Sequence, residues 1–342
     1  MKTLAKVLAV LCAVLFVVSG MLALTLFNIE RNAFSAKTYK QAFAGQGLYE
    51  KMPAVLAGAL TTSIAENPGA DPYLKALTQA DWERTLASLL PPDELKTLTD
   101  DALDAVFDYL NGKTDSASLS LLPFKRRMAG ESGVEAVKQI LAAQPDCTAE
   151  QLTQMGLNLI SGGEMILCNP PAETVDLFAP MIETQLQVMT IAIPDEVTLL
   201  KGNQAGAPND PRERLGQLRA GMKLTPVLPL LFLFGLTMFA VRSLGDWLKW
   251  WGVPFLVTGA LSALLALVGS PLVTGFIRQA LQNGSLPPAL LSLAQETVGA
   301  VTRQVLSPVI TQGLILAVLG IVMTVGSAFT AQRGKPKSNR AS

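Results

Sequence analysis

The 342-residue chain contains no histidine, and only 16% of its residues are charged. Without histidine it can build neither a Ser-His-Asp nor a Cys-His nucleophilic site, and it offers no histidine metal ligand. It also lacks a P-loop sequence for phosphate and a cysteine cluster for zinc. Carboxylates alone can act as acid and base, but no pair stands out. We therefore expect a protein that is not an enzyme and that has no cofactor and no metal site.

Apolar sequence, by contrast, is abundant: 50% of the residues are hydrophobic and the mean hydropathy is +0.37. This is too apolar for an ordinary soluble protein. Charged residues bracket four stretches that hold no charge, and each stretch is long enough to span a bilayer as a helix. The bracketing pairs are Lys6 and Glu30, Lys223 and Arg242, Lys249 and Arg278, and Arg303 and Arg333. The sequence therefore predicts four transmembrane helices in a lipid bilayer.

The first apolar stretch has two interpretations. Lys2 and Lys6 precede it, as in the positive region of a cleaved signal peptide. Its apolar part, 7–27, is longer than that of most signal peptides, and it has no clear small-x-small cleavage site. Leu11, which precedes Cys12, is not the small residue that a lipoprotein signal needs. We favour an anchor that is not cleaved.

The net charge of zero hides an asymmetry along the chain. Residues 30–222 carry 16 Lys and Arg against 25 Asp and Glu, a net charge of −9. Both ends of the chain and the turn at 242–249 carry eight basic residues, opposed only by Asp246: Lys2, Lys6, Arg242, Lys249, Arg333, Lys335, Lys337 and Arg340. Cytoplasmic loops are enriched in Lys and Arg. We therefore expect a multi-pass plasma-membrane protein with both termini in the cytoplasm, and an acidic outer domain that does not bind nucleic acid.

This topology divides the chain into segments. We predict, in order, an N-terminal transmembrane anchor at 1–29, an extracytoplasmic helical domain at 30–222, a transmembrane hairpin of helices two and three at 223–271, an extracytoplasmic amphipathic helical segment at 272–307, a fourth transmembrane helix at 308–332 and a basic cytoplasmic tail at 333–342.

Within the outer domain, apolar residues recur at spacings of three and four, which is typical of helices. The predicted helices lie at 36–45, 47–64, 78–90, 92–110, 131–143, 148–161 and 172–191. Residues 117–123 alternate between polar and apolar and are expected to pair as a short strand with 196–200. The expected class is therefore an all-α membrane protein with a small two-stranded β element, and a loop at 201–211 leads into the second span.

A short internal similarity suggests a duplication. Residues 90–95 and 286–291 share the pattern Leu-Pro-Pro-x-x-Leu, and each precedes a predicted helix, the first ending at Leu110 and the second at Leu306. One hypothesis is two related halves, each with an outer helix between two spans. The alternative is that proline commonly opens helices.

Cys147 and Cys168 both fall in the segment assigned to the oxidising side of the membrane, where cysteine pairs form disulfides. We expect a disulfide between them, with two buried thiols as the alternative. Closing this loop would stabilise the domain by about 3 kcal/mol. Thr148 and Gln151 then form a capping box for the next helix.

Asp100, Asp104 and Asp108 recur at every fourth residue of the 92–110 helix. This spacing does not fit an EF-hand loop. We favour a solvated face, and the alternative is a face that holds calcium or interacts with a basic partner.

Glycines recur at a spacing of seven in the last two spans, at Gly252 and Gly259 and again at Gly313 and Gly320. Such glycines let helices approach closely, so they predict a packing seam between the spans or within a homo-oligomer, with chance as the alternative. Three tryptophans, Trp247, Trp250 and Trp251, are expected to anchor the hairpin at the membrane interface.

Four sequence elements resemble those of uncharacterised bacterial multi-pass membrane proteins with a large helical extracytoplasmic domain: Tyr39, Gly47-Leu48-Tyr49-Glu50-Lys51-Met52-Pro53, Cys147-Thr148 and Cys168-Asn169-Pro170-Pro171. The order of one span, a large outer domain and three spans also resembles the permease subunits of MacB/FtsX-type ABC systems. Those permeases have a longer cytoplasmic segment between spans two and three than the 242–249 turn of this chain.

Three functions are therefore considered. In the first, the outer domain binds or scaffolds an envelope protein or an apolar ligand without catalysis. In the second, the chain is a permease-like subunit that works with a separate ATPase. In the third, the chain binds a lipid or another apolar ligand, which requires a deep apolar cleft that opens at the membrane surface.

Overall fold

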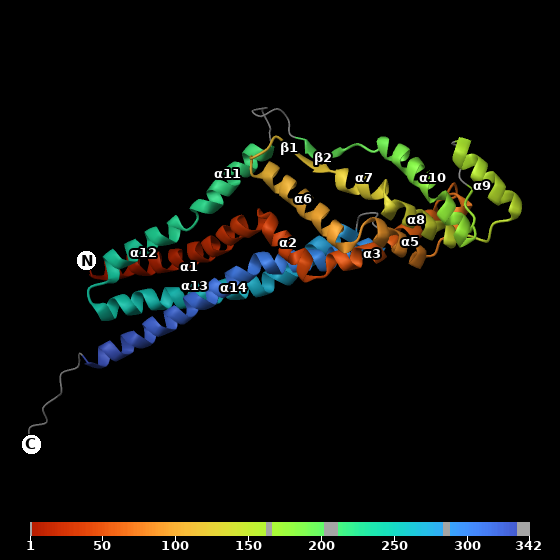
Figure 1. The fold of residues 1–342 in the computed structure, drawn as a ribbon. Coiled ribbons are helices and arrows are strands. Elements are labelled where there is room, and N and C mark those ends of the chain that lie inside the picture. Colours follow the sequence, from red (N-terminus) through yellow and green to blue (C-terminus); the bar gives the residue numbers. More distant parts are fainter. Residues whose placement is uncertain (1, 162–165, 202–210, 283–287, 334–342) are drawn as a thin grey trace, which may run out of the picture. The chain divides into compact units, whose positions relative to one another are not determined.

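Figure 1 shows the computed structural model of the chain, which describes residues 2–161, 166–201, 211–282 and 288–333. Within these ranges the chain forms fourteen α-helices and one two-stranded sheet, so the predicted all-α class is confirmed. The chain divides into two units. The first, here called the span unit, comprises 1–38, 207–277 and 298–342. The second, here called the helical unit, comprises 39–206 and 278–297.

The four predicted spans are present as helices that are long and apolar enough to cross a membrane. They lie at Thr3–Ala33, Arg212–Ala240, Leu244–Leu281 and Leu290–Thr330. The corresponding elements are α1 (Lys2–Ala33), α11 (Pro211–Leu224) with α12 (Val227–Ala240), α13 (Leu244–Gln282) and α14 (Pro288–Arg333). Many of their exposed side chains are large and apolar, which suits a solvent that offers no hydrogen bonds.

Two of these helices are much longer than a span. At 1.5 Å per residue, the 39 residues of α13 cover about 58 Å and the 46 residues of α14 about 69 Å, against a hydrocarbon core of roughly 30 Å. The prediction that a helix ends at Leu306 is therefore wrong, because α14 continues through it to Arg333. Charged residues such as Arg303 end an apolar stretch without ending a helix. Residues 283–287, which include the first part of the second Leu-Pro-Pro pattern, lie outside the described residues.

The second span has a break that the sequence analysis did not anticipate. Residues 212–223, which were assigned no element, form most of α11, and α12 starts only after a turn at Thr225 and Pro226. The Thr225 backbone N–H and hydroxyl both donate to the Met222 carbonyl, at 3.3 and 2.7 Å. Pro226 has no N–H with which to continue α11, so the helix ends there. Residues 202–210 of the predicted loop, and the tail beyond Arg333, lie outside the described residues.

α1 and α12 share an apolar core in the span unit. Its buried members are Ala9, Phe16, Leu233 and Leu236. The Phe16 ring stacks on Phe255 of α13 at 5.5 Å between centroids. Cys12 lies against Gly235, where an added Cβ would sit 3.3 Å from the Cys12 sulfur. The first apolar stretch is thus packed against the other spans.

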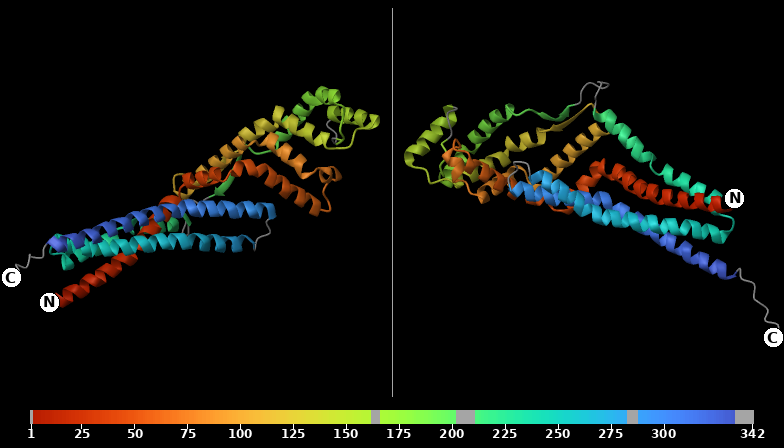
Figure 2. Two further views of the ribbon diagram at one scale, coloured as in Figure 1. Left: turned by 90° about the horizontal axis from the view of Figure 1, so that it is seen from below. Right: turned by 180° about the vertical axis from the view of Figure 1, so that it is seen from behind.

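α13 and α14 contact each other backbone to backbone at the four glycines singled out in the sequence. A Cβ built at Gly259 would overlap the backbones of Gly313 and Ala317. One built at Gly320 would lie 2.7 Å from the Gly252 carbonyl oxygen. The two helices also run side by side in all three views (Figures 1 and 2). The structure therefore brings the four glycines together as one seam between these spans, which is one of the two arrangements predicted.

The helical unit contains most of the predicted outer-domain elements at the expected positions. Its helices are α2 (Ala36–Gly45), α3 (Leu48–Glu66), α4 (Pro72–Ala76), α5 (Gln79–Leu89), α6 (Pro92–Leu110), α7 (Leu122–Met128), α8 (Glu131–Ala142), α9 (Ala149–Ser161) and α10 (Ala172–Ile191). The short helices α4 and α7 were missed. Each has a proline in its first turn. The first two residues of α7 lie within the segment 117–123 that was predicted as a strand.

The two strands pair as predicted. β1 (Ser116–Ser120) runs antiparallel to β2 (Glu196–Lys201), with an irregularity between Ala117 and Ser118. Ala117 is fully buried, whereas every residue of β2 is exposed. The sheet therefore ties two distant parts of the helical unit together mainly by backbone hydrogen bonds.

α6 follows the sequence signals at both of its ends. Pro92 occupies the first helical position, and Gly112 after the C-terminus has φ +72°, a left-handed conformation that suits glycine. Tyr39 of α2 packs on Phe107 of α6 at 4.9 Å between ring centroids. α6 thereby contributes to the core of the helical unit, in contrast to the long continuous helix that follows Pro288.

The glycine seam generates a testable difference between two alanine substitutions in α13. Gly259→Ala should lower the free energy of unfolding by about 1–3 kcal/mol, because the new methyl group would overlap α14. Gly269→Ala is the matched control, since nothing lies within 4 Å of its Cβ and alanine favours the helix. Reversible detergent-induced unfolding of the purified full chain measures both. Equal stability of the two variants would contradict the seam.

Candidate functional site

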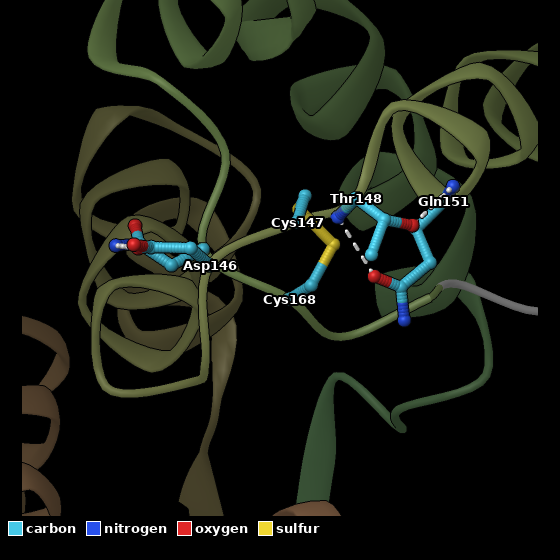
Figure 3. The surroundings of a disulfide bond; sticks show 6 residues. Asp146, Cys147, Thr148, Gln151 and Cys168 are labelled. Atoms are coloured by element: carbon cyan, nitrogen blue, oxygen red, sulfur yellow. Dashed lines mark hydrogen bonds between the residues drawn. A yellow bond between two sulfur atoms is a disulfide. The ribbon is translucent and has the colours of Figure 1, made fainter.

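The disulfide predicted from the sequence is present and joins Cys147 to Cys168, with 5.0 Å between their Cα atoms (Figure 3). The segments that carry the two cysteines also pair by backbone. The Cys147 N–H donates to the Asn169 carbonyl at 3.0 Å, and the Asn169 N–H donates to the Pro145 carbonyl at 2.8 Å. Cys168 is buried. The bridge therefore closes a short parallel pairing within the helical unit.

The residues after Cys147 begin α9 in the predicted way. The Thr148 backbone N–H donates to the side-chain oxygen of Gln151 at 2.9 Å, and the Gln151 N–H donates to the Thr148 hydroxyl at 3.3 Å (Figure 3). This reciprocal pair is the expected capping box. It holds the start of α9 directly beside the disulfide.

A surface cleft of about 690 Å³ lies beside the disulfide. Its walls come from α8, from the start of α10 and from the two paired segments: Lys138, Leu141, Ala142, Asp146, Cys147, Asn169, Pro170, Pro171, Ala172, Val175 and Asp176. A volume between 300 and 1,000 Å³ is usual for ligand sites. The disulfide and the two prolines make one wall of this cleft stiff.

Charged side chains at the cleft are paired. Lys138 of α8 donates to Asp176 of α10 at 2.8 Å, and this hydrogen bond raises the pKa of Lys138. Asp146 accepts a hydrogen bond from the Asn169 side chain at 2.9 Å. The lining thus carries one positive and two negative charges. Within the described part of the chain, no group of three or more Cys, Asp or Glu is placed to hold a metal ion. The cleft therefore offers both polar and apolar side chains for binding contacts.

The acidic stripe on α6 is neutralised by lysines. Asp100 pairs with Lys96 at 2.7 Å, Asp104 with Lys40 at 2.6 Å, and Asp108 with Lys113 at 2.7 Å. Exposed pairs of this kind contribute little to stability, so a multivalent basic partner could exchange with the lysines. An interaction face here stays a prediction.

Asp100 also lies next to a buried tyrosine. The Tyr49 hydroxyl donates to the Asp100 carboxylate at 3.4 Å. Burial, together with the neighbouring Asp100 charge, raises the pKa of Tyr49 to about 12. Tyr49 therefore stays neutral at physiological pH and helps to orient one member of the stripe.

The three tryptophans lie in the first turns of α13, and they also pack against other spans. The Trp251 ring lies 5.1 Å from that of Trp247 and 5.7 Å from that of Phe255. Its indole N–H donates to the Thr237 hydroxyl of α12 at 3.1 Å. Trp250 packs against the α1–α12 core. Trp251 thus ties α12 to α13, a role that the sequence analysis did not assign; interface anchoring by the three stays a prediction.

A polar cluster in the span unit was also missed. Asn28 of α1 and Gln312 of α14 exchange side-chain hydrogen bonds of 2.7 and 3.3 Å. Glu30 is buried, and its carboxylate forms ion pairs with Arg219 of α11 (N···O 3.0 Å) and with Lys223 (N···O 3.5 Å). Asn28 and Glu30 at the end of an apolar stretch were the sequence signal for this cluster, because an amide or a carboxylate needs a partner when it is buried.

No protein-family model, curated protein or solved structure matches the chain.

Loss of the disulfide should loosen one part of the helical unit. Replacing both Cys147 and Cys168 by serine should lower its stability by about 3 kcal/mol, because the bridge closes a loop of 21 residues in the unfolded chain. Hydrogen exchange of the full-length protein, followed by mass spectrometry, should show faster exchange in α9 and α10 and unchanged exchange in α1. Cys12→Ala, which removes the free cysteine, is the control. Unchanged protection in α9 and α10 would contradict a structural role for the bridge.

Proposed function

We propose that the chain is a non-enzymatic plasma-membrane protein whose helical unit binds an envelope component outside the cytoplasm. The observation that carries this proposal is the cleft of about 690 Å³ beside the Cys147–Cys168 disulfide. Disulfides persist in oxidising compartments, which favours an extracytoplasmic position for the unit that contains this one. The partner is an envelope protein or an apolar ligand that contacts the cleft.

Charge supports the same orientation. Arg242 lies in the link between α12 and α13, and Lys249 lies in the second turn of α13, as expected near a cytoplasmic turn. The four candidate spans then return both termini to the cytoplasm. The packing of Ala9 and Phe16 of α1 against α12 favours an anchor that remains in the membrane, because its removal would expose this core.

The permease-like alternative is favoured by the order of spans, one before the helical unit and three after it. Contact with a cytoplasmic ATPase would need protein between spans two and three. α12 ends at Ala240 and α13 starts at Leu244. The Ser243 hydroxyl accepts a hydrogen bond from the Asp246 backbone N–H at 3.1 Å, so α13 is capped by the last residue of the link itself. So short a link is a poor surface for an ATPase, and we favour the binding function.

Site-specific photo-crosslinking in living cells tests this proposal. A benzophenone amino acid at Val175, in the wall of the cleft, should give a discrete crosslinked product. Val188 is the matched control, because it is an exposed valine on the same helix, 13 residues further along. Adding Ala172→Trp at the edge of the cleft should abolish the Val175 product by filling the space.

Two results would overturn the proposal. One is equal crosslinking, or none, at Val175 and Val188. The other is co-purification of an ATP-hydrolysing subunit with the full chain, which would support the permease-like alternative instead.

A further inference from the structure

The span unit contains a second cavity, an apolar groove of about 440 Å³. Phe16, Gly20 and Phe27 of α1 form one side of it. Pro229 and Leu233 of α12 form another, and Leu316 of α14 also contributes. All of these residues lie within candidate membrane spans, so the medium around the groove is lipid. Leu230, on its rim, is 64% exposed, which leaves the groove open toward the bilayer.

The dimensions of the groove decide what can occupy it. From Phe16 to Phe27 it follows eleven residues of α1, about 16 Å, which is roughly half of the 30 Å hydrocarbon core and therefore one leaflet. Apart from Thr258 and Gln312, the residues that line the groove are apolar. A groove of this length with an apolar lining suits one extended acyl chain of a lipid in that leaflet.

The polar cluster lies at one end of the groove. Gln312 lines the groove and exchanges hydrogen bonds with Asn28, the residue after Phe27. Glu30 follows Phe27 by three residues on α1, so it lies on the same helix face about 4.5 Å further along the axis. An apolar channel with polar groups at one mouth matches the two ends of an amphiphile.

Two cations lie beside Glu30 at this mouth. One carboxylate oxygen of Glu30 lies 3.0 Å from the Arg219 guanidinium and 3.5 Å from the Lys223 ammonium. Arg219 is also held over the Phe34 ring, 4.8 Å from its centroid. Lys223 is more loosely held, and its side chain is 59% exposed. The ammonium group of Lys223 is therefore accessible to an anionic group at this mouth.

We propose that the groove is a binding site for one acyl chain of an anionic phospholipid, whose phosphate lies against Lys223 and Arg219. The acyl chain runs from Phe27 to Phe16 between α1 and α12. On the proposed topology the lipid belongs to the outer leaflet. The site is separate from the cleft of the helical unit, so it stands or falls independently of the partner proposed there.

The test uses the full chain reconstituted in vesicles of phosphatidylglycerol and phosphatidylcholine in equal parts. The protein is extracted in mild detergent, and the lipid that remains bound is quantified by mass spectrometry. The wild-type protein should retain phosphatidylglycerol in preference to phosphatidylcholine. Lys223→Gln should reduce this preference about fivefold, the effect of one basic residue near a membrane surface. Lys249→Gln, which removes an exposed charge at the opposite end of the spans, should leave it unchanged.

A second pair of variants tests the groove itself. Leu230→Trp places a large ring on the rim and should reduce retention of both lipids. Leu231→Trp is the matched control, because Leu231 is 60% exposed and does not line the groove. Circular dichroism confirms that both variants keep their helices. Equal lipid retention by the Leu230 and Leu231 variants, or equal headgroup preference of the Lys223 and Lys249 variants, would overturn the proposal.

Discussion

The span unit depends on direct contact between helices in a medium where the hydrophobic effect does not drive them together. Lipid tails solvate leucine as well as another helix does, so association must come from close packing and polar pairing. α13 and α14 meet backbone to backbone at Gly252, Gly259, Gly313 and Gly320. α1 joins them through the Asn28–Gln312 pair. These few contacts determine which apolar faces remain open to lipid.

The helical unit is stabilised differently. Among the described residues of 39–206, its helices have at most 20 residues each, and this part of the chain is acidic. A disulfide and a small sheet tie together segments that are distant in sequence. The disulfide stiffens one wall of the cleft, and α8 and α10 form its other walls. The cleft is open at the surface, and the charged side chains in its lining, Lys138, Asp146 and Asp176, all have hydrogen-bond partners.

Much of this fold could be predicted from the sequence, because apolar periodicity and proline or glycine punctuation mark helices and their ends. α6 begins at Pro92 and stops at Leu110 as expected. The predicted end at Leu306 failed, because charge limits a membrane span but does not limit a helix. The short helix α7 was missed, because a single turn carries too little periodic signal. The disulfide was predictable because only two of the three cysteines, Cys147 and Cys168, lie outside the apolar stretches. The cleft of the helical unit and the apolar groove of the span unit could not be predicted, because their walls consist of residues that only the tertiary packing brings together.

The central claim is that the helical unit lies outside the cytoplasm. Labelling of spheroplasts with a membrane-impermeant maleimide tests it most directly. Lys75→Cys places a thiol on the exposed surface of the helical unit, and Lys249→Cys places one beside the short turn between α12 and α13. The account predicts that the thiol at position 75 reacts in intact spheroplasts and that the thiol at position 249 reacts only after the membrane is permeabilised. The reverse pattern would contradict it.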